Sequence, residues 1–282
     1  MLDKVRAVSS LALAVSLIAS SSTTALAADL PVTGPEDAIS SWTGFYVGGH
    51  LGGAIVDWTS ETSFVAINPL TGEMSSATFP SLDSSDPAFV GGVHAGYNWQ
   101  SGSYLFGLEA TASALAGESN DHYTIPSATL ISAGLGAITD PVDGFVSDWS
   151  RSVEWLATAR ARAGYLVNPD AFLYLTGGLA VGGVRSDASF TGLIDHGVPT
   201  LVSVSSNSRE TQVGYAVGAG AEAALTDRLS IRAEYLFVDL GNTDRPLGTY
   251  IDSACCSQTV SVDEEVRIHT VTIGLTYRFG SQ

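Results

Sequence analysis

Apolar and polar side chains alternate along eight segments of the chain, and this period of two is the strongest constraint that the sequence carries. Alternation of this kind predicts β-strands with one apolar and one polar face. After the first thirty residues, no apolar run reaches the roughly 18 residues that a membrane-spanning helix needs. The chain is therefore predicted to be all-β, with strands at residues 43–58, 88–100, 104–117, 151–167, 171–185, 211–225, 228–239 and 264–279.

The connections between these segments alternate in length. Tight turns at residues 101–103, 168–170 and 226–227 alternate with long loops at residues 59–87, 118–150, 186–210 and 240–263. The short connections contain Ser-Gly-Ser, Asn-Pro-Asp and Thr-Asp, whose residues favour tight hairpins. An even number of strands, with short turns at one end and long loops at the other, is typical of bacterial outer-membrane barrels.

The composition of the two strand faces indicates which face meets lipid. In the last segment Val271, Ile273 and Leu275 share one face, and Thr272 and Thr276 share the other. Aromatic residues gather towards the ends of the apolar faces and charges lie mid-strand on the polar faces, as lipid outside and a polar lumen require. The sequence thus predicts an eight-stranded antiparallel up-and-down transmembrane β-barrel with four long external loops. A water-soluble β-sandwich or lipocalin-like barrel is the alternative, since alternation alone does not distinguish inside from outside.

A barrel of eight strands has an interior only just wide enough for side chains. The polar faces contribute four acids and four bases, which we expect to pair across the lumen and fill it, because an unpaired buried charge is strongly destabilising. These residues are Glu109, Glu154, Arg160, Arg162, Glu222, Arg232, Glu234 and Arg278. The pairing predicts a barrel without a continuous pore, and a small-solute porin is the alternative.

The N-terminus has the pattern of a secretory signal peptide. A short leader with Lys4 and Arg6 precedes an apolar stretch of signal-peptide length, and the small-x-small pattern predicts cleavage between Ala27 and Ala28. An uncleaved membrane anchor is the alternative, but the apolar stretch is too short for a spanning helix. The expected organisation is a signal peptide at 1–27, a periplasmic N-terminal segment at 28–42 and an outer-membrane barrel at 43–282.

The charge balance is acidic. The chain has 12 basic and 29 acidic residues, a net charge of -17, so nucleic acid is not an expected partner. Carboxylates of the external loops would share divalent cations with the phosphates of lipopolysaccharide, or would simply keep the surface soluble. They include Asp57, Glu61, Glu73, Asp83, Asp86, Glu118, Asp121, Asp140, Asp143, Asp148, Asp263, Glu264 and Glu265.

Motifs of catalysis are absent from the sequence. No nucleophile elbow, zinc-protease helix, phosphate loop or dinucleotide fingerprint occurs at usable spacing, so we expect no enzyme, no cofactor and no bound metal. The weak candidates are His50 and His94, which are predicted to face the lumen. With Tyr46 and Glu109 they would form either a small metal or acid/base site or plain lumen hydrogen bonds.

The external loops offer two further candidate features. Adjacent Cys255 and Cys256 would form a strained vicinal disulfide, cross-link to a partner, or be an incidental pair. Long loops on a rigid barrel are also where an adhesin or a ligand binder, of heme for example, would carry its site.

Six stretches, at strand positions and just after the signal, carry a family resemblance. They are ADLP at 28–31, WTGFYVGG at 42–49, FLYLTGGLA at 172–180, GAGAE at 218–222, RAEY at 232–235 and YRF at 277–279. These stretches resemble the outer-membrane β-barrel surface-protein (porin-like) family of α-proteobacteria, within the outer-membrane-protein-A-like barrel group. The resemblance implies a monomeric or loosely associated barrel that supports envelope integrity as a surface antigen. Its expected partners are outer-membrane lipid, lipopolysaccharide and the barrel-assembly machinery. The chain departs from the family pattern at one point: such chains commonly end on the aromatic residue that the assembly machinery reads, whereas here residues 280–282 follow Phe279.

Overall fold

The computed structural model describes most of the chain after residue 40. The described ranges are 41–67, 71–78, 81–125, 145–195, 199–252 and 256–279. The expected signal peptide, its cleavage position at Ala27 and Ala28, and Cys255 all lie outside these residues. The described residues contain no helix with the length and hydropathy that crossing a bilayer requires.

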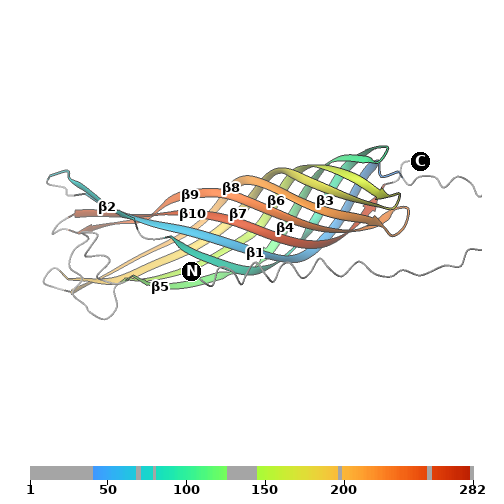
Figure 1. Ribbon diagram of the computed structural model, residues 1–282. Helices are drawn as coiled ribbons and strands as arrows, with labels where there is room; N and C mark the ends of the chain where they lie inside the picture. The colour runs from blue at the N-terminus through green and yellow to red at the C-terminus, as the bar shows by residue number, and fades with distance from the viewer. Residues whose placement is uncertain are drawn as a thin grey trace, which may run out of the picture. The chain divides into compact units, whose positions relative to one another are not determined.

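Eight long strands form a closed antiparallel ring (Figure 1). The described residues form ten strands in all, two of them short: β1 (Gly44–Ile67), β2 (Met74–Thr78), β3 (Leu82–Ser101), β4 (Tyr104–Ala116), β5 (Ser119–Ile125), β6 (Phe145–Asn168), β7 (Ala171–Asp195), β8 (Pro199–Ala224), β9 (Leu229–Asp252) and β10 (Cys256–Arg278). The ring runs β1-β3-β4-β6-β7-β8-β9-β10 and closes because β10 pairs with β1 from Tyr46↔Arg278 to Ile67↔Ser257. The short strands β2 and β5 are added to the ends of β1 and β6. The predicted eight-stranded up-and-down barrel is confirmed.

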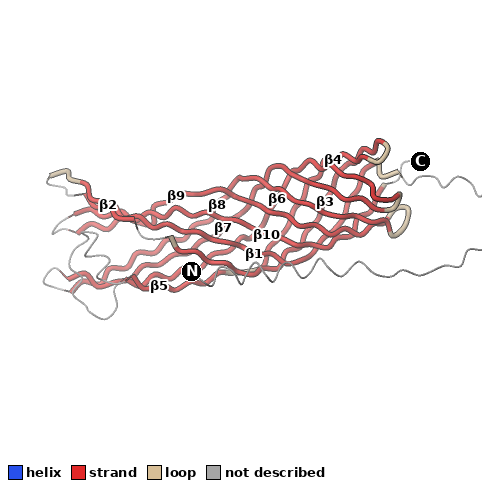
Figure 2. The backbone as a smooth tube through the Cα atoms, viewed as in Figure 1, coloured by secondary structure: helices blue, strands red, loops and turns tan. Residues whose placement is uncertain are grey.

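The strands continue well beyond the predicted ends, into segments that were expected to be loops. β1 extends to Ile67 rather than residue 58, and β6 begins at Phe145 rather than residue 151. Figure 2 shows these extensions as continuous strand at the end opposite the short turns. The prediction ended each strand where its apolar face ended. A hydrogen-bonded ladder needs no apolar face, and Ser, Thr and Val in these segments pair readily across strands.

The outward face of the ring is apolar. Leu51 and Phe89 are 71% and 79% exposed. Other large apolar side chains on this face include Phe45, Val93, Trp99, Tyr104, Phe106, Leu108, Trp155, Tyr165, Leu173, Leu175, Leu179, Val213, Tyr215, Val217, Val271, Ile273, Leu275, Tyr277 and Phe279. An exposed apolar surface of this extent is rare on water-soluble monomers. It forms a belt around the barrel, with aromatic residues towards both edges, as lipid contact requires.

Inward-facing glycines make room for the large side chains of the lumen. A Cβ on Gly220 would lie 2.5 Å from the Cζ and Oη atoms of Tyr174, and a Cβ on Gly274 would lie 3.1 Å from the Cγ atom of Arg232. A Cβ on Gly96 would collide with the Tyr46 hydroxyl. The glycine content of the chain therefore has a packing role inside a narrow barrel.

Side chains fill the ring in alternating apolar and charged layers. From the short turns outward, the layers are an apolar one around Trp42 and Phe172, a charged one around Glu109, an apolar one around Leu156 and Ile268, and a charged one around Arg151. The second apolar layer contains fifteen buried residues, Trp58 and Leu240 among them. The lumen is thus packed like a protein core and is not uniformly polar.

Candidate functional site

Glu109 is the centre of the inner charged layer. Arg160 and Arg232, from β6 and β9, donate to its carboxylate at 2.7 and 2.6 Å, and Arg162 of β6 lies 3.5 Å away. The hydroxyl of Tyr46, from β1, donates to the same carboxylate at 2.9 Å. All five side chains are buried. One carboxylate thus ties together strands from opposite parts of the ring.

Two further carboxylates complete this layer. Glu234 accepts hydrogen bonds from Arg160 at 2.9 Å and from the Tyr174 hydroxyl at 2.7 Å. Glu222 accepts a hydrogen bond from Ser230 at 2.5 Å, and its carboxylate lies 3.5 Å from Arg162. The layer therefore balances three acids against three arginines, and each arginine contacts more than one acid.

Two of the eight residues expected in this network lie elsewhere. Arg278 is buried near the short turns, where it lies 3.9 Å from the centre of the Trp42 ring and donates to backbone carbonyls at Thr226 and Asp227. Glu154 does not enter the lumen. It lies on the outward face, 3.8 Å from Arg209, with 44% of its side chain exposed.

A β-bulge explains why the prediction for Glu154 was wrong. The pairing of β6 with β7 shifts register between Val153 and Trp155, so one extra residue is inserted at this point. Val153 and Leu156 both face inward, and the two residues between them both face outward. The strict alternation used to place Glu154 fails across such an insertion.

The two lumen histidines make separate hydrogen bonds. His50 contacts the Ser113 hydroxyl at 2.9 Å, and His94 contacts the Thr276 hydroxyl at 3.0 Å. Their rings stack with centres 5.7 Å apart. Among the described residues, no group of three or more His, Cys, Asp or Glu side chains is placed to hold a metal ion.

A second charged cluster, around Arg151, was missed by the sequence analysis. Arg151 is almost completely buried, donates to the Ser60 hydroxyl at 2.6 Å and lies 3.4 Å from the Glu264 carboxylate. It also contacts the carboxylate of Asp121. The Trp58 ring lies 5.2 Å away, within range of a cation–π interaction.

The Arg151 cluster corrects part of the acidic-loop prediction. Asp121 and Glu264 were expected on solvated loops, but their side chains are 19% and 2% exposed because they offset Arg151. The inward position of Glu264 was predictable, since it is an even number of residues from the inward residue Thr270 on the same strand and therefore lies on the same strand face. Arg151 gave no such signal, because the bulge at Glu154 reverses its parity relative to the rest of β6.

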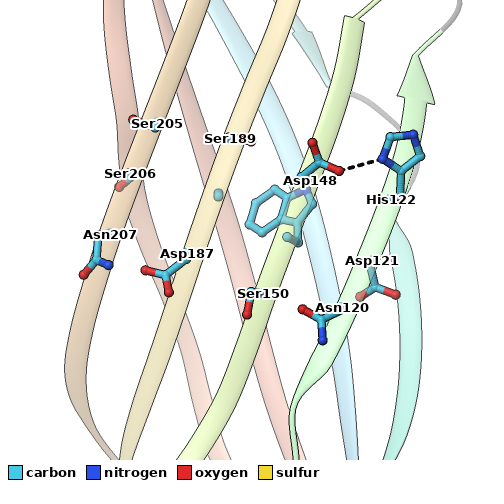
Figure 3. A pocket seen from close by; sticks show the side chains of 12 residues that line it. Asn120, Asp121, His122, Asp148, Ser150, Asp187, Ser189, Ser205, Ser206 and Asn207 are labelled. Atoms are coloured by element: carbon cyan, nitrogen blue, oxygen red, sulfur yellow. Dashed lines mark hydrogen bonds and ion pairs between the residues drawn. The ribbon is translucent and has the colours of Figure 1, made fainter.

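A polar hollow of about 600 Å³ lies across β5, β6, β7 and β8, beyond the apolar belt (Figure 3). Two cross-strand rows carry its outward side chains. They are His122, Asp148, Ser189 and Ser205 in one row, and Asn120, Ser150, Asp187 and Asn207 in the other. The His122 ring and the Asp148 carboxylate are 2.6 Å apart at one edge. The hollow offers hydroxyl, amide and carboxylate groups, which suit a ligand rich in hydroxyl groups.

The comparisons with known proteins agree with this architecture. Residues 11–279 match the family described as the outer membrane protein beta-barrel domain. The chain belongs to this family. It is an outer-membrane β-barrel protein, as its relatives also indicate.

Two curated relatives are similar over most of their length. The 31 kDa outer-membrane immunogenic protein of Brucella melitensis biotype 1 is 31% identical over 281 residues, which cover 94% of this chain and 97% of that protein. The 22 kDa outer membrane protein of Rhizobium leguminosarum bv. viciae is 29% identical over 214 residues, 76% of this chain and 71% of that protein. The resemblance to α-proteobacterial outer-membrane surface proteins is therefore confirmed.

The solved structures that match the chain are more distant. The outer membrane protein OprG from Pseudomonas aeruginosa has 14% identity and a TM-score of 0.41, and covers 84% of this chain and 97% of its own. Neisserial surface protein A has 16% identity and a TM-score of 0.35, and covers 80% of this chain and 99% of its own.

Proposed function

We propose that this barrel is a structural, non-enzymatic surface protein that supports envelope integrity and does not conduct solutes. The observation that carries the proposal is the filling of the lumen. A charged layer and a layer of fifteen buried apolar residues lie in series inside the ring. The relatives named as immunogenic outer-membrane proteins support a role at the surface.

The two lumen layers would oppose ion passage in different ways. In the charged layer, an ion would have to displace Arg160 or Arg232 from carboxylates that they hold at hydrogen-bond distance. A cavity beside these arginines has a volume of only about 20 Å³, enough for a single water molecule. The apolar layer around Leu156 and Ile268 would exclude water, as hydrophobic constrictions do in closed channels.

We expect refolded protein in a planar bilayer to show no steady single-channel steps. The matched variant is the charge-balanced double substitution Arg160→Ser with Glu234→Ser, which removes one partner of each sign from the inner charged layer. If this variant still shows heat-modifiable gel migration, it should also fail to conduct, because the apolar layer around Leu156 and Ile268 still lies in series with the weakened charged layer. Steady steps from the wild-type barrel would contradict the filled lumen and favour a small-solute porin.

Envelope support is tested in cells. A strain without this chain should admit more of a hydrophobic dye across its outer membrane than the parent strain, and the wild-type chain should restore the barrier. Unchanged dye entry and unchanged detergent resistance in the deletion strain would contradict a structural role.

A further inference from the structure

A tier of charged residues marks the outer edge of the apolar belt. On six strands, an outward side chain with a permanent charge follows the last apolar residues of the belt. These side chains are Asp57 on β1, Glu154 on β6, Arg185 on β7, Arg209 on β8, Asp239 on β9 and Arg267 on β10. In a chain with a net charge of -17, three outward arginines beyond the apolar belt need an explanation.

Arg185 and Arg209 are directly opposite each other on neighbouring strands. Among the described members of the tier, they are the one pair in which two positively charged residues face each other across neighbouring strands. Like charges in this position repel each other. Arg185 is offset by Asp187 at 3.0 Å. Arg209 lies 3.8 Å from the carboxylate of Glu154, and 65% of its side chain is exposed. The pair can therefore accept a further anion between its two guanidinium groups.

Three zones follow one another along β7 and β8. Leu179 and Val213, which are 65% and 66% exposed, belong to the apolar belt. Arg209 lies four residues beyond Val213, about 13 Å along the strand at the usual rise. Ser205, in the polar hollow, lies four residues further, again about 13 Å. The outward face therefore changes from apolar to cationic to polar over the length of one lipid headgroup and its sugars.

We propose that this face of β6, β7 and β8 binds a phosphorylated glycolipid of the outer leaflet. Its acyl chains would lie on Leu179 and Val213, its phosphate between Arg185 and Arg209, and its sugars in the polar hollow. This site is independent of the lumen and holds whether or not the barrel conducts.

The charges around the site specify the ligand further. One pair of arginines fits one phosphate group. The polar hollow above it also contains the carboxylate of Asp148, which accepts hydrogen bonds from sugar hydroxyls and repels a second phosphate. A polyanionic polymer is disfavoured by the acidic chain as a whole. The ligand is therefore anionic at the arginine pair and neutral, with many hydroxyl groups, beyond it.

The test of the phosphate position uses the refolded full barrel in detergent and monophosphorylated lipid A as the probe, with native mass spectrometry to count bound lipid during a titration. The variant is Arg185→Gln with Arg209→Gln. The matched control is Arg228→Gln, an exposed arginine at the opposite end of the barrel that contacts Tyr277. Because charge-assisted hydrogen bonds are lost, affinity of the double variant should fall about tenfold or more, while the control stays within about twofold of the wild type.

Two further probes identify the source of the phosphate. Dephosphorylated lipid A should bind the wild type no better than monophosphorylated lipid A binds the double variant. Inorganic phosphate at millimolar concentration should not compete with monophosphorylated lipid A for the wild-type barrel. Equal binding of the phosphorylated lipid by wild type and double variant would overturn the proposal. Competition by inorganic phosphate would also overturn it, since the site would then be one for a free anion.

The sugar zone is tested separately. Ser189→Ala with Asn207→Ala removes a hydroxyl and an amide from the polar hollow without touching the arginine pair. This variant should bind lipid A like the wild type but should bind core-bearing lipopolysaccharide more weakly. If this variant binds both lipid A and core-bearing lipopolysaccharide as the wild type does, the sugars do not reach the hollow.

Discussion

Glu109→Gln should lower the free energy of unfolding by about 3–5 kcal/mol, because it removes the carboxylate that three buried arginines share. Glutamine keeps the shape of the side chain and can still accept a hydrogen bond from Tyr46. It leaves three guanidinium groups of the layer facing only Glu222 and Glu234. Urea unfolding of the refolded barrel in lipid, followed by the shift between folded and unfolded gel bands, measures the loss.

Glu154→Gln is the matched control for this experiment. It makes the same chemical change in a residue that lies outside the lumen and whose ion pair with Arg209 is exposed. Exposed pairs contribute about 0–1 kcal/mol, so stability should hardly change. Equal losses in the two variants would show that the Glu109 layer does not stabilise the barrel. A large loss of stability in the control alone would contradict the outward position of Glu154 and show that its side chain lies in the lumen.

The barrel itself was predictable because its signal repeats in every strand. Each strand has one face for lipid and one for the lumen, so the period of two recurs, and tight turns such as Asn168-Pro169-Asp170 separate the strands. The residue types on each face also predicted correctly which face points outward, since the apolar Val271 and Ile273 face outward and the polar Thr272 faces inward. These features depend only on local sequence.

The composition of the charged layers was less predictable, because it depends on strand register and on single insertions. Nothing in the sequence around Glu154 marks the bulge that turns it outward and Arg151 inward. Which acid meets Arg151 depends on how far β5 and β10 extend, and the extent of these polar extensions is not visible in an apolar pattern. The arginine pair on β7 and β8 likewise follows from the register Arg185↔Arg209 and not from either strand alone.

The packing of glycine against the lumen side chains leads to the second large effect. Gly220→Val should lower the free energy of unfolding by about 1–3 kcal/mol, since overpacking a filled interior forces neighbours to move. A Cβ at this position would lie 2.5 Å from the Tyr174 ring and 2.7 Å from the carbonyl oxygen of Ala233. Tyr174 would have to give up its hydrogen bond to Glu234, so the damage should reach the charged layer.

The control for this substitution is Gly53→Val, because a Cβ on Gly53 has nothing within 4 Å and valine suits a strand that faces lipid. Its stability should equal or exceed that of the wild type in the same urea titration. A double-mutant cycle then locates the cause: Tyr174→Ala should cost much less in the Gly220→Val background than in the wild type, because the tyrosine has already been displaced. Additive losses would mean that Gly220 acts through the β8–β9 backbone contact and that the space it leaves is not needed by Tyr174.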